Sequence, residues 1–128
     1  MANVHTLKNA THEAVFKVYS TESAGGVYDI SLADDVCADT ETFDANNAIV
    51  TIQEIFWGAK KDKQIDLSRV DDPEANTVHG HYYLLNSGHY DFVGFVDDVY
   101  ADGDIRITAD GPFHMIIKVK KVSGFTPA

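Results

Sequence analysis

Cysteine is almost absent from this sequence, since Cys37 is the only one among 128 residues. A framework of internal disulfides is therefore excluded. The neighbourhood of Cys37, ADDVCADTETFD, is rich in carboxylates, which raise the pKa of a thiol and make it a poor nucleophile. We interpret Cys37 as a structural residue, and the shortage of cysteine favours synthesis in a reducing, intracellular compartment.

Long hydrophobic runs and recognisable motifs are also missing. No segment approaches the roughly 18 consecutive apolar residues that would span a bilayer. The beginning, MANVHTLKNATHEAVF, lacks the basic and apolar regions of a secretory signal. A phosphate-binding loop, a dinucleotide fingerprint and the G-x-S-x-G and H-E-x-x-H motifs are absent, although a triad assembled in space stays open. We therefore predict a non-enzymatic protein with no catalytic residue, no cofactor and no membrane partner.

Basic residues are few, because ten Lys and Arg stand against twenty Asp and Glu, for a net charge of −10. Binding to nucleic acid depends on neutralising phosphates, so this charge argues against a nucleic-acid partner. The lysines gather in two groups, 60–63 and 118–121, which we interpret as turn and edge-strand lysines that oppose aggregation. The acidity favours solubility or a partner with a basic surface.

The residues that are present indicate β-strands. Apolar and polar side chains alternate, or β-branched residues cluster, in the runs 12–19, 26–32, 47–57, 63–70, 104–110 and 113–122. Turn compositions such as SAGG, GAKKD and DDPEANT separate these runs. The pattern predicts an all-β fold, a single antiparallel β-sandwich of jelly-roll type with about eight strands. One domain covers 1–128, with terminal arms at about 1–11 and 122–128.

One segment, 31–47, is long and irregular. Asp, Thr and Asn dominate it, and no apolar side chain recurs at helical spacing, although a single helical turn fits. A long acidic loop on a small β-domain is either a contact arm for a partner or a merely solvated loop.

The run VHGHYYLLNSGHYDF, at 78–92, concentrates histidine and tyrosine. It predicts a β-hairpin with a three-residue loop at 86–88. His79 and His81 then share one face roughly 6.5–7 Å apart, close enough for one metal ion, while His89 lies roughly 13 Å from His81. Zinc would need further ligands from another strand or subunit, so we interpret the two histidines as structural and only as weak metal candidates.

The run DDVYADGDIRI, at 97–107, places four carboxylates around a glycine. The EF-hand spacing fails from either Asp98 or Asp102, because the required oxygen, glycine and glutamate positions do not match. A hairpin turn at 102–104 is favoured, and an irregular calcium site formed by Asp97, Asp98, Asp102 and Asp104 stays open as the alternative.

Two other classes of function stay open. Trp57, Tyr82, Tyr83 and Tyr100 could bind a carbohydrate in a receptor-binding tail domain, although Trp57 ends the most hydrophobic strand and suits the core. A small metal-dependent β-barrel enzyme of cupin type is a second alternative, and it would need clustered histidine and carboxylate ligands.

Several segments together resemble a known group of proteins. IVTIQEIFWGAKKDKQIDL, YYLLNSGHYDFVGF and ADGDIRITADGPFHMIIKVKK are similar, in this order, to small all-β proteins of tailed bacteriophages, particularly marine ones. The matching elements are Trp57, the 85–92 run, the 103–108 run with Gly111, and the 116–121 run. The segment HEAVFKVYSTESAGGVYDISL resembles the first hairpin of that group. Asn86 replaces a glycine of the pattern, and the ADTETFDANN loop differs.

This resemblance implies a virion structural protein with no catalytic residues. We expect a capsid decoration (cement) protein, made in the host cytoplasm, that binds the major capsid protein or other virion proteins and associates with its own copies. A neck or tail protein is the alternative. The acidic 33–46 loop, the sheet edges and the two terminal arms are the expected contact regions.

Overall fold

The computed structural model describes residues 3–72, 77–92, 94, 96–97 and 99–127. Within them the chain forms eleven strands and one π-helical turn, η1 (Leu32–Val36). The strands are β1 (Val4–Asn9), β2 (Glu13–Ser20), β3 (Gly26–Ile30), β4 (Glu41–Phe43), β5 (Ile49–Ala59), β6 (Gln64–Asp72), β7 (Thr77–Leu85), β8 (Ser87–Asp91), β9 (Asp104–Ala109), β10 (Phe113–Ser123) and β11 (Phe125–Pro127).

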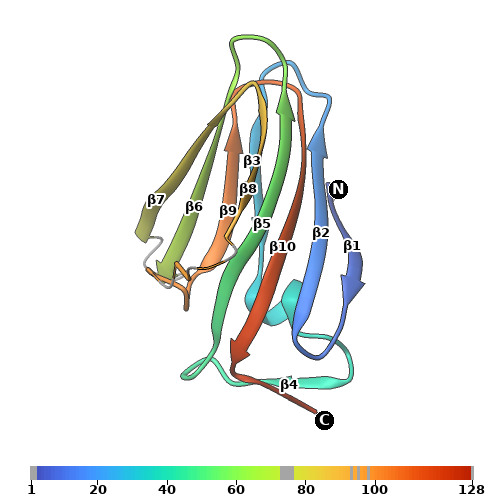
Figure 1. Ribbon diagram of the computed structural model, residues 1–128, viewed down its shortest axis with the longest axis vertical. Helices are drawn as coiled ribbons and strands as arrows, with labels where there is room; N and C mark the ends of the chain where they lie inside the picture. Colours follow the sequence, from blue (N-terminus) through green and yellow to red (C-terminus); the bar gives the residue numbers. More distant parts are fainter. Residues whose placement is uncertain (1–2, 73–76, 93, 95, 98, 128) are drawn as a thin grey trace.

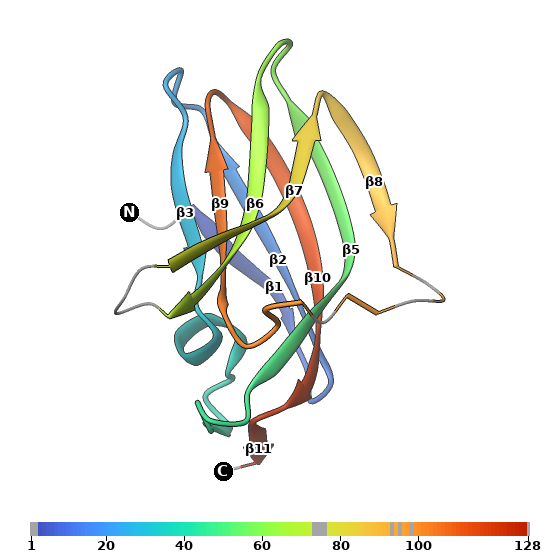
Figure 2. The ribbon, with the colours of Figure 1, turned by 90° about the vertical axis from the view of Figure 1, so that its left-hand side faces the viewer.

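Two antiparallel sheets form the sandwich (Figures 1 and 2). One sheet has five strands in the order β1-β2-β10-β5-β8, and the other has four in the order β3-β9-β6-β7. Apart from the short β4–β11 pair and the added β1, eight strands remain, and most connections between them cross from one sheet to the other. This is the topology of a jelly roll. The predicted all-β sandwich is therefore confirmed, and its three additional strands are β1, β4 and β11.

The core is formed by every second side chain of the strands, which points inward from each sheet. In β9 the side chains of Ile105, Ile107 and Ala109 are buried, while the residues between them are half-buried. Strand β10 buries every second residue from Phe113 to Lys121. The inward sets from both sheets form one hydrophobic cluster, which includes Trp57. The interpretation of Trp57 as a core residue is therefore confirmed.

The predicted hairpin at 78–92 is wrong. Strand β7 pairs with β6, and strand β8 pairs with β5, so the two strands belong to opposite sheets. Asn86 adopts a left-handed conformation (φ 59°) between them, where the chain passes from one sheet to the other. The chain does turn at Asn86, but Ser87 and Gly88, expected in the loop, belong to β8, and the turn joins two layers of the sandwich.

The terminal and acidic segments lie against the sandwich. Strand β1 pairs with β2, and β11 pairs with β4, so the segments expected as arms contain strands of their own. The acidic segment contains η1, where the Ser31 hydroxyl accepts a hydrogen bond from the Asp34 N–H (3.1 Å), and then β4. In Figure 2 this turn and the β4–β11 pair lie together at one end of the sandwich.

Candidate functional site

The described metal candidates lie within β7, in the connection from β8 to β9 and at the first residue of β9. His81 occupies a bulge in β7, where the register with β6 shifts, and only 5% of its side chain is exposed. Its Nε2 lies 3.2 Å from Asp97 Oδ2, and the Tyr82 hydroxyl donates to the same carboxylate. The structure therefore brings His81 together with one of the predicted carboxylates.

Burial and charge shift the pKa values of this group. Burial lowers the pKa of His81 despite the attraction of Asp97, and it raises that of Tyr82. Burial would also raise the pKa of Asp97, but hydrogen bonds from the Tyr82 hydroxyl and the Val99 N–H, together with the nearby His81 and Arg69, outweigh it and lower the pKa. A neutral imidazole and a neutral phenol around a carboxylate form a satisfied polar cluster within the protein.

His79 does not join this cluster. Its ring stacks on Tyr100 at a centroid distance of 3.5 Å and an interplanar angle of 9°. The two histidines expected to share an ion therefore turn to different partners. Asp98, another candidate, lies outside the described residues.

A buried arginine, Arg69, lies near the remaining carboxylates. The Arg69 guanidinium donates to three backbone carbonyls: those of Val50 (3.0 Å), Ala101 (2.8 Å) and Gly103 (2.7 Å from Nη2). Two of these oxygens belong to the 97–107 segment that was considered for calcium, so the guanidinium fixes the backbone of this segment. Sequence reasoning missed Arg69, although the alternation of Ile65 and Leu67 places position 69 on the inward face.

Asp102 and Asp104 act on Arg69 through their charge. Burial lowers the pKa of Arg69 to about 10, and the two carboxylates oppose that shift, so the group is charged at neutral pH. Asp104 Oδ1 also accepts a hydrogen bond from the Leu32 N–H (2.9 Å), while burial raises the pKa of its carboxyl. Among the described candidates, Asp97 thus pairs with His81 and Tyr82, whereas Asp102 and Asp104 act on Arg69.

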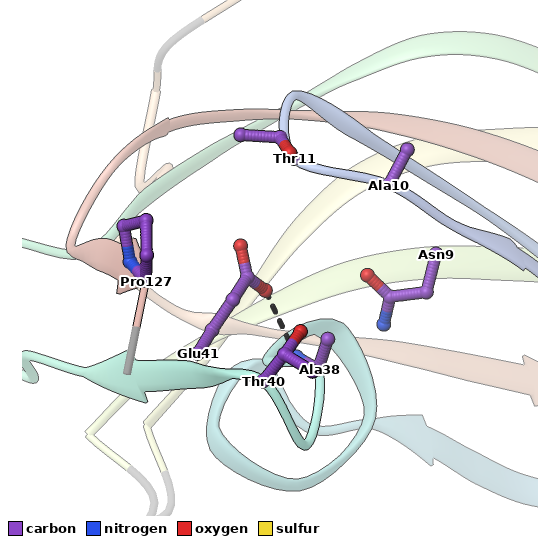
Figure 3. A pocket seen from close by; sticks show the side chains of 7 residues that line it. All are labelled: Asn9, Ala10, Thr11, Ala38, Thr40, Glu41 and Pro127. Atoms are coloured by element: carbon purple, nitrogen blue, oxygen red, sulfur yellow. Dashed lines mark hydrogen bonds between the residues drawn. The ribbon is translucent and has the colours of Figure 1, made fainter.

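A polar cavity of about 250 Å³ lies at the end of the sandwich that holds β4 (Figure 3). In it, the Glu41 carboxylate accepts a hydrogen bond from the Ala38 N–H (2.9 Å) and forms a buried ion pair with Lys121 (2.5 Å). The Asn9 amide group donates to the Val36 carbonyl (3.1 Å). These groups tie the β1–β2 turn, η1, β4 and β10 together, so we assign the cavity a structural role.

The outer face of the five-stranded sheet leaves several large apolar side chains exposed, among them Tyr19, Phe56 and Ile116. Neighbouring strands align Lys17 with Ile116, Ile116 with Phe56, and Phe56 with His89. Phe56 is 44% exposed, and a depression of about 460 Å³ lies beside Tyr19, His114 and Ile116. We call this surface the contact face; it comprises His5, Lys17, Tyr19, Phe56, His89, His114 and Ile116.

The contact face differs in charge from the rest of the molecule. Apart from the buried Lys121, the same strands carry one more basic than acidic side chain, while the whole chain has a net charge of −10. The basic residues are Lys8, Lys17, Lys118 and Lys120, and the acidic residues are Glu13, Glu54 and Asp91. A partner therefore meets apolar groups and balanced charge on this face, and strong negative charge elsewhere.

The aromatic side chains expected to bind carbohydrate are divided by the fold. Trp57 is buried and donates through Nε1 to the Leu85 carbonyl (3.1 Å). Tyr82 is half-buried against Phe92, whereas Tyr83 is 67% exposed and Tyr100 is exposed beside His79. Tyr83 is the most accessible of the four.

Cys37 is half-buried, and burial raises the pKa of its thiol, with a further contribution from the Glu41 charge. This direction agrees with its interpretation as a structural residue.

Within the described residues, no helix combines the length and apolar character needed to cross a bilayer. Comparison with known proteins gives no match to a family model, to a curated protein or to a solved structure.

Proposed function

We propose that this protein is a virion structural component of a tailed bacteriophage, and that it decorates the capsid through protein–protein contacts. Two independent features support the proposal. The sequence resembles small all-β phage virion proteins over most of its length. The strand order is that of a jelly roll, a topology used in viral capsid domains as well as in lectins and cupins.

The contact face is the structural feature that best supports a binding role. Tyr19, Phe56 and Ile116 are large hydrophobic side chains left accessible on adjoining strands of one sheet. Burying them against a partner removes apolar surface from water, which is favourable by about 25 cal/mol per Å². A repeating capsid lattice multiplies such modest contacts, because many copies bind at once.

We assign the major capsid protein as the occupant of this face. The balanced charge of the contact face allows close approach of another protein. The negative charge on the rest of the surface makes two copies of this chain repel each other. The acidic 33–46 segment is a second contact region, suited to a basic patch on a virion protein.

Capsid binding tests the proposal through Phe56. We expect Phe56→Ser to weaken co-sedimentation with purified capsids by about tenfold or more, because a central apolar anchor is lost. Val27→Ser is the matched control: Val27 is 57% exposed but lies on β3 of the other sheet. Equal loss of binding in both variants, or none in either, would contradict the assignment of the contact face.

The copy number in the virion tests whether the protein binds the capsid or the neck and tail. Mass spectrometry of purified virions should detect hundreds of copies for a decoration protein, and a few copies would favour the neck or tail. Absence from the virion would contradict the proposal altogether.

One observation favours a carbohydrate-binding role as the second candidate. Tyr83 presents an exposed ring on β7, and aromatic rings of this kind bind the apolar faces of sugars. Glycan-array binding that Tyr83→Ala abolishes would favour this role. For a cupin-like enzyme, His79 and His81 do not supply a shared site, since they turn to separate partners.

A further inference from the structure

We propose that Glu54, His89 and Asp91 form a binding site for a divalent transition-metal ion, with zinc as the best-suited ion. One ligand atom from each residue lies within 4.8 Å of the other two. The site is on the outer face of the five-stranded sheet, where β5 meets the edge strand β8. It is distinct from the weak candidates suggested by sequence spacing.

The register between β5 and β8 assembles the three ligands. Glu54 lies directly opposite Asp91, and His89 follows two positions away on the same face. Directly opposed side chains have Cβ atoms about 4.5–5.5 Å apart, so both carboxylates can reach one ion. The imidazole reaches the same point from the neighbouring position.

The histidine is held ready for coordination. Its ring stacks on Phe56 with a centroid distance of 4.0 Å and an interplanar angle of 3°. Its Nε2 pairs with Glu54 Oε2 at 3.0 Å, so two of the ligand groups already face each other. Ligand atoms around tetrahedral zinc lie roughly 3.3–3.5 Å from one another, so a small adjustment of side chains completes the geometry.

Electrostatics also favour a cation at this point. Opposed like charges destabilise a pair of strands, and Glu54 and Asp91 are such a pair. Lys118, which lies opposite Glu54 on β10, directs its Nζ to Glu13 at 3.2 Å. A divalent ion between the two carboxylates would neutralise both charges and join the edge strand to the sheet.

The ligand set selects the kind of ion. Imidazole suits zinc, copper, iron and nickel, whereas magnesium and calcium prefer oxygen ligands alone. Three protein ligands leave a position open on tetrahedral zinc for water or for a group from a binding partner. Because β8 is an edge strand, that position faces solvent.

Calorimetric titration of the untagged protein with zinc chloride tests the site. We expect one zinc ion per chain, and we expect His89→Gln and Asp91→Asn each to weaken binding by more than about tenfold. The control is His114→Gln, because His114 lies on the same face, opposite Gly58 and outside the cluster. This control should bind zinc like the unmodified protein.

Two outcomes would overturn the proposal. One is no zinc binding at millimolar concentrations, and the other is binding that persists unchanged in His89→Gln. Magnesium supplies a further comparison: equal affinity for magnesium and zinc would mean a diffuse acidic surface without an imidazole ligand. The titration uses the isolated protein, so its result is independent of capsid binding.

Discussion

The Arg69 side chain is 1% exposed, and its surroundings explain why a buried charge is tolerated there. Its donors are matched to the carbonyls of Val50, Ala101 and Gly103. Asp102 and Asp104 supply negative charge nearby. The guanidinium therefore holds the connection before β9 in a position that strand pairing alone does not fix.

Replacement of Arg69 should be costly. We expect Arg69→Leu to lower the free energy of unfolding by about 3–5 kcal/mol, because three buried carbonyls lose their donor and the nearby carboxylates lose their counter-charge. Arg69→Lys should cost less, since it keeps the charge but loses the planar fork of donors. Urea denaturation at neutral pH measures both values.

Arg106 provides the control for this comparison. Its Nε lies 2.8 Å from Asp29 Oδ1, but the pair is exposed to solvent. Arg106→Leu should therefore cost no more than about 1 kcal/mol. A loss at position 69 as small as that at position 106 would show that the guanidinium does not organise the loop.

At the scale of elements, the alternating runs were predictable because one face of each strand is buried. The patterns at 104–110 and 113–122 correspond to β9 and β10, which lie in opposite sheets. The period of two specifies strand and face from local sequence alone. It does not specify the partner strand, since the pairing of β10 with β5 joins residues about sixty positions apart.

The β7–β8 region shows the consequence of not knowing the partner strand from local sequence. A tight turn at Asn86 is compatible with a hairpin and with a crossing between sheets, so the local sequence favours both equally. Pairing of β8 with β5 decides the outcome and brings His89 beside Glu54. Sequence alternation places His89 and Asp91 on one face, but the third ligand depends on a contact between distant segments. Spacing therefore could not identify the metal cluster.

The junction of β10 and β11 offers a test of an element boundary. Gly124 has φ +87°, and a Cβ added there would lie 2.3 Å from Ala48 Cα. Gly124→Ala should destabilise the protein by about 2–5 kcal/mol, through both backbone strain and overlap with the Ala48 backbone. Thermal unfolding monitored by circular dichroism measures the change.

Gly94 separates the two causes. It has φ +92°, but a Cβ there would meet no atom within 4 Å. Gly94→Ala should therefore show the cost of backbone strain alone, about 1–3 kcal/mol. Equal losses at the two positions would mean that close packing on Ala48 is unimportant.

For the whole molecule, the excess of acidic groups opposes compactness. Twenty acidic residues face ten basic ones, and several of the basic groups are already committed to acidic partners, as Lys121 is to Glu41 and Arg106 to Asp29. The remaining carboxylates repel one another across the surface. Folding draws them together, so the folded state bears more of this repulsion than the unfolded chain.

Salt should therefore stabilise this protein. The Debye length falls from about 30 Å at 0.01 M to about 3 Å at 1 M, which screens repulsion between exposed carboxylates. We expect Tm to rise by about 2–5 °C between 10 mM and 500 mM NaCl, equivalent to about 1 kcal/mol. Asp39→Lys tests the cause, because residue 39 is exposed and the change reduces the net negative charge by two. This variant should melt at a higher temperature in low salt and gain less from added salt. A Tm that falls with salt would mean that attractive surface pairs outweigh the net repulsion.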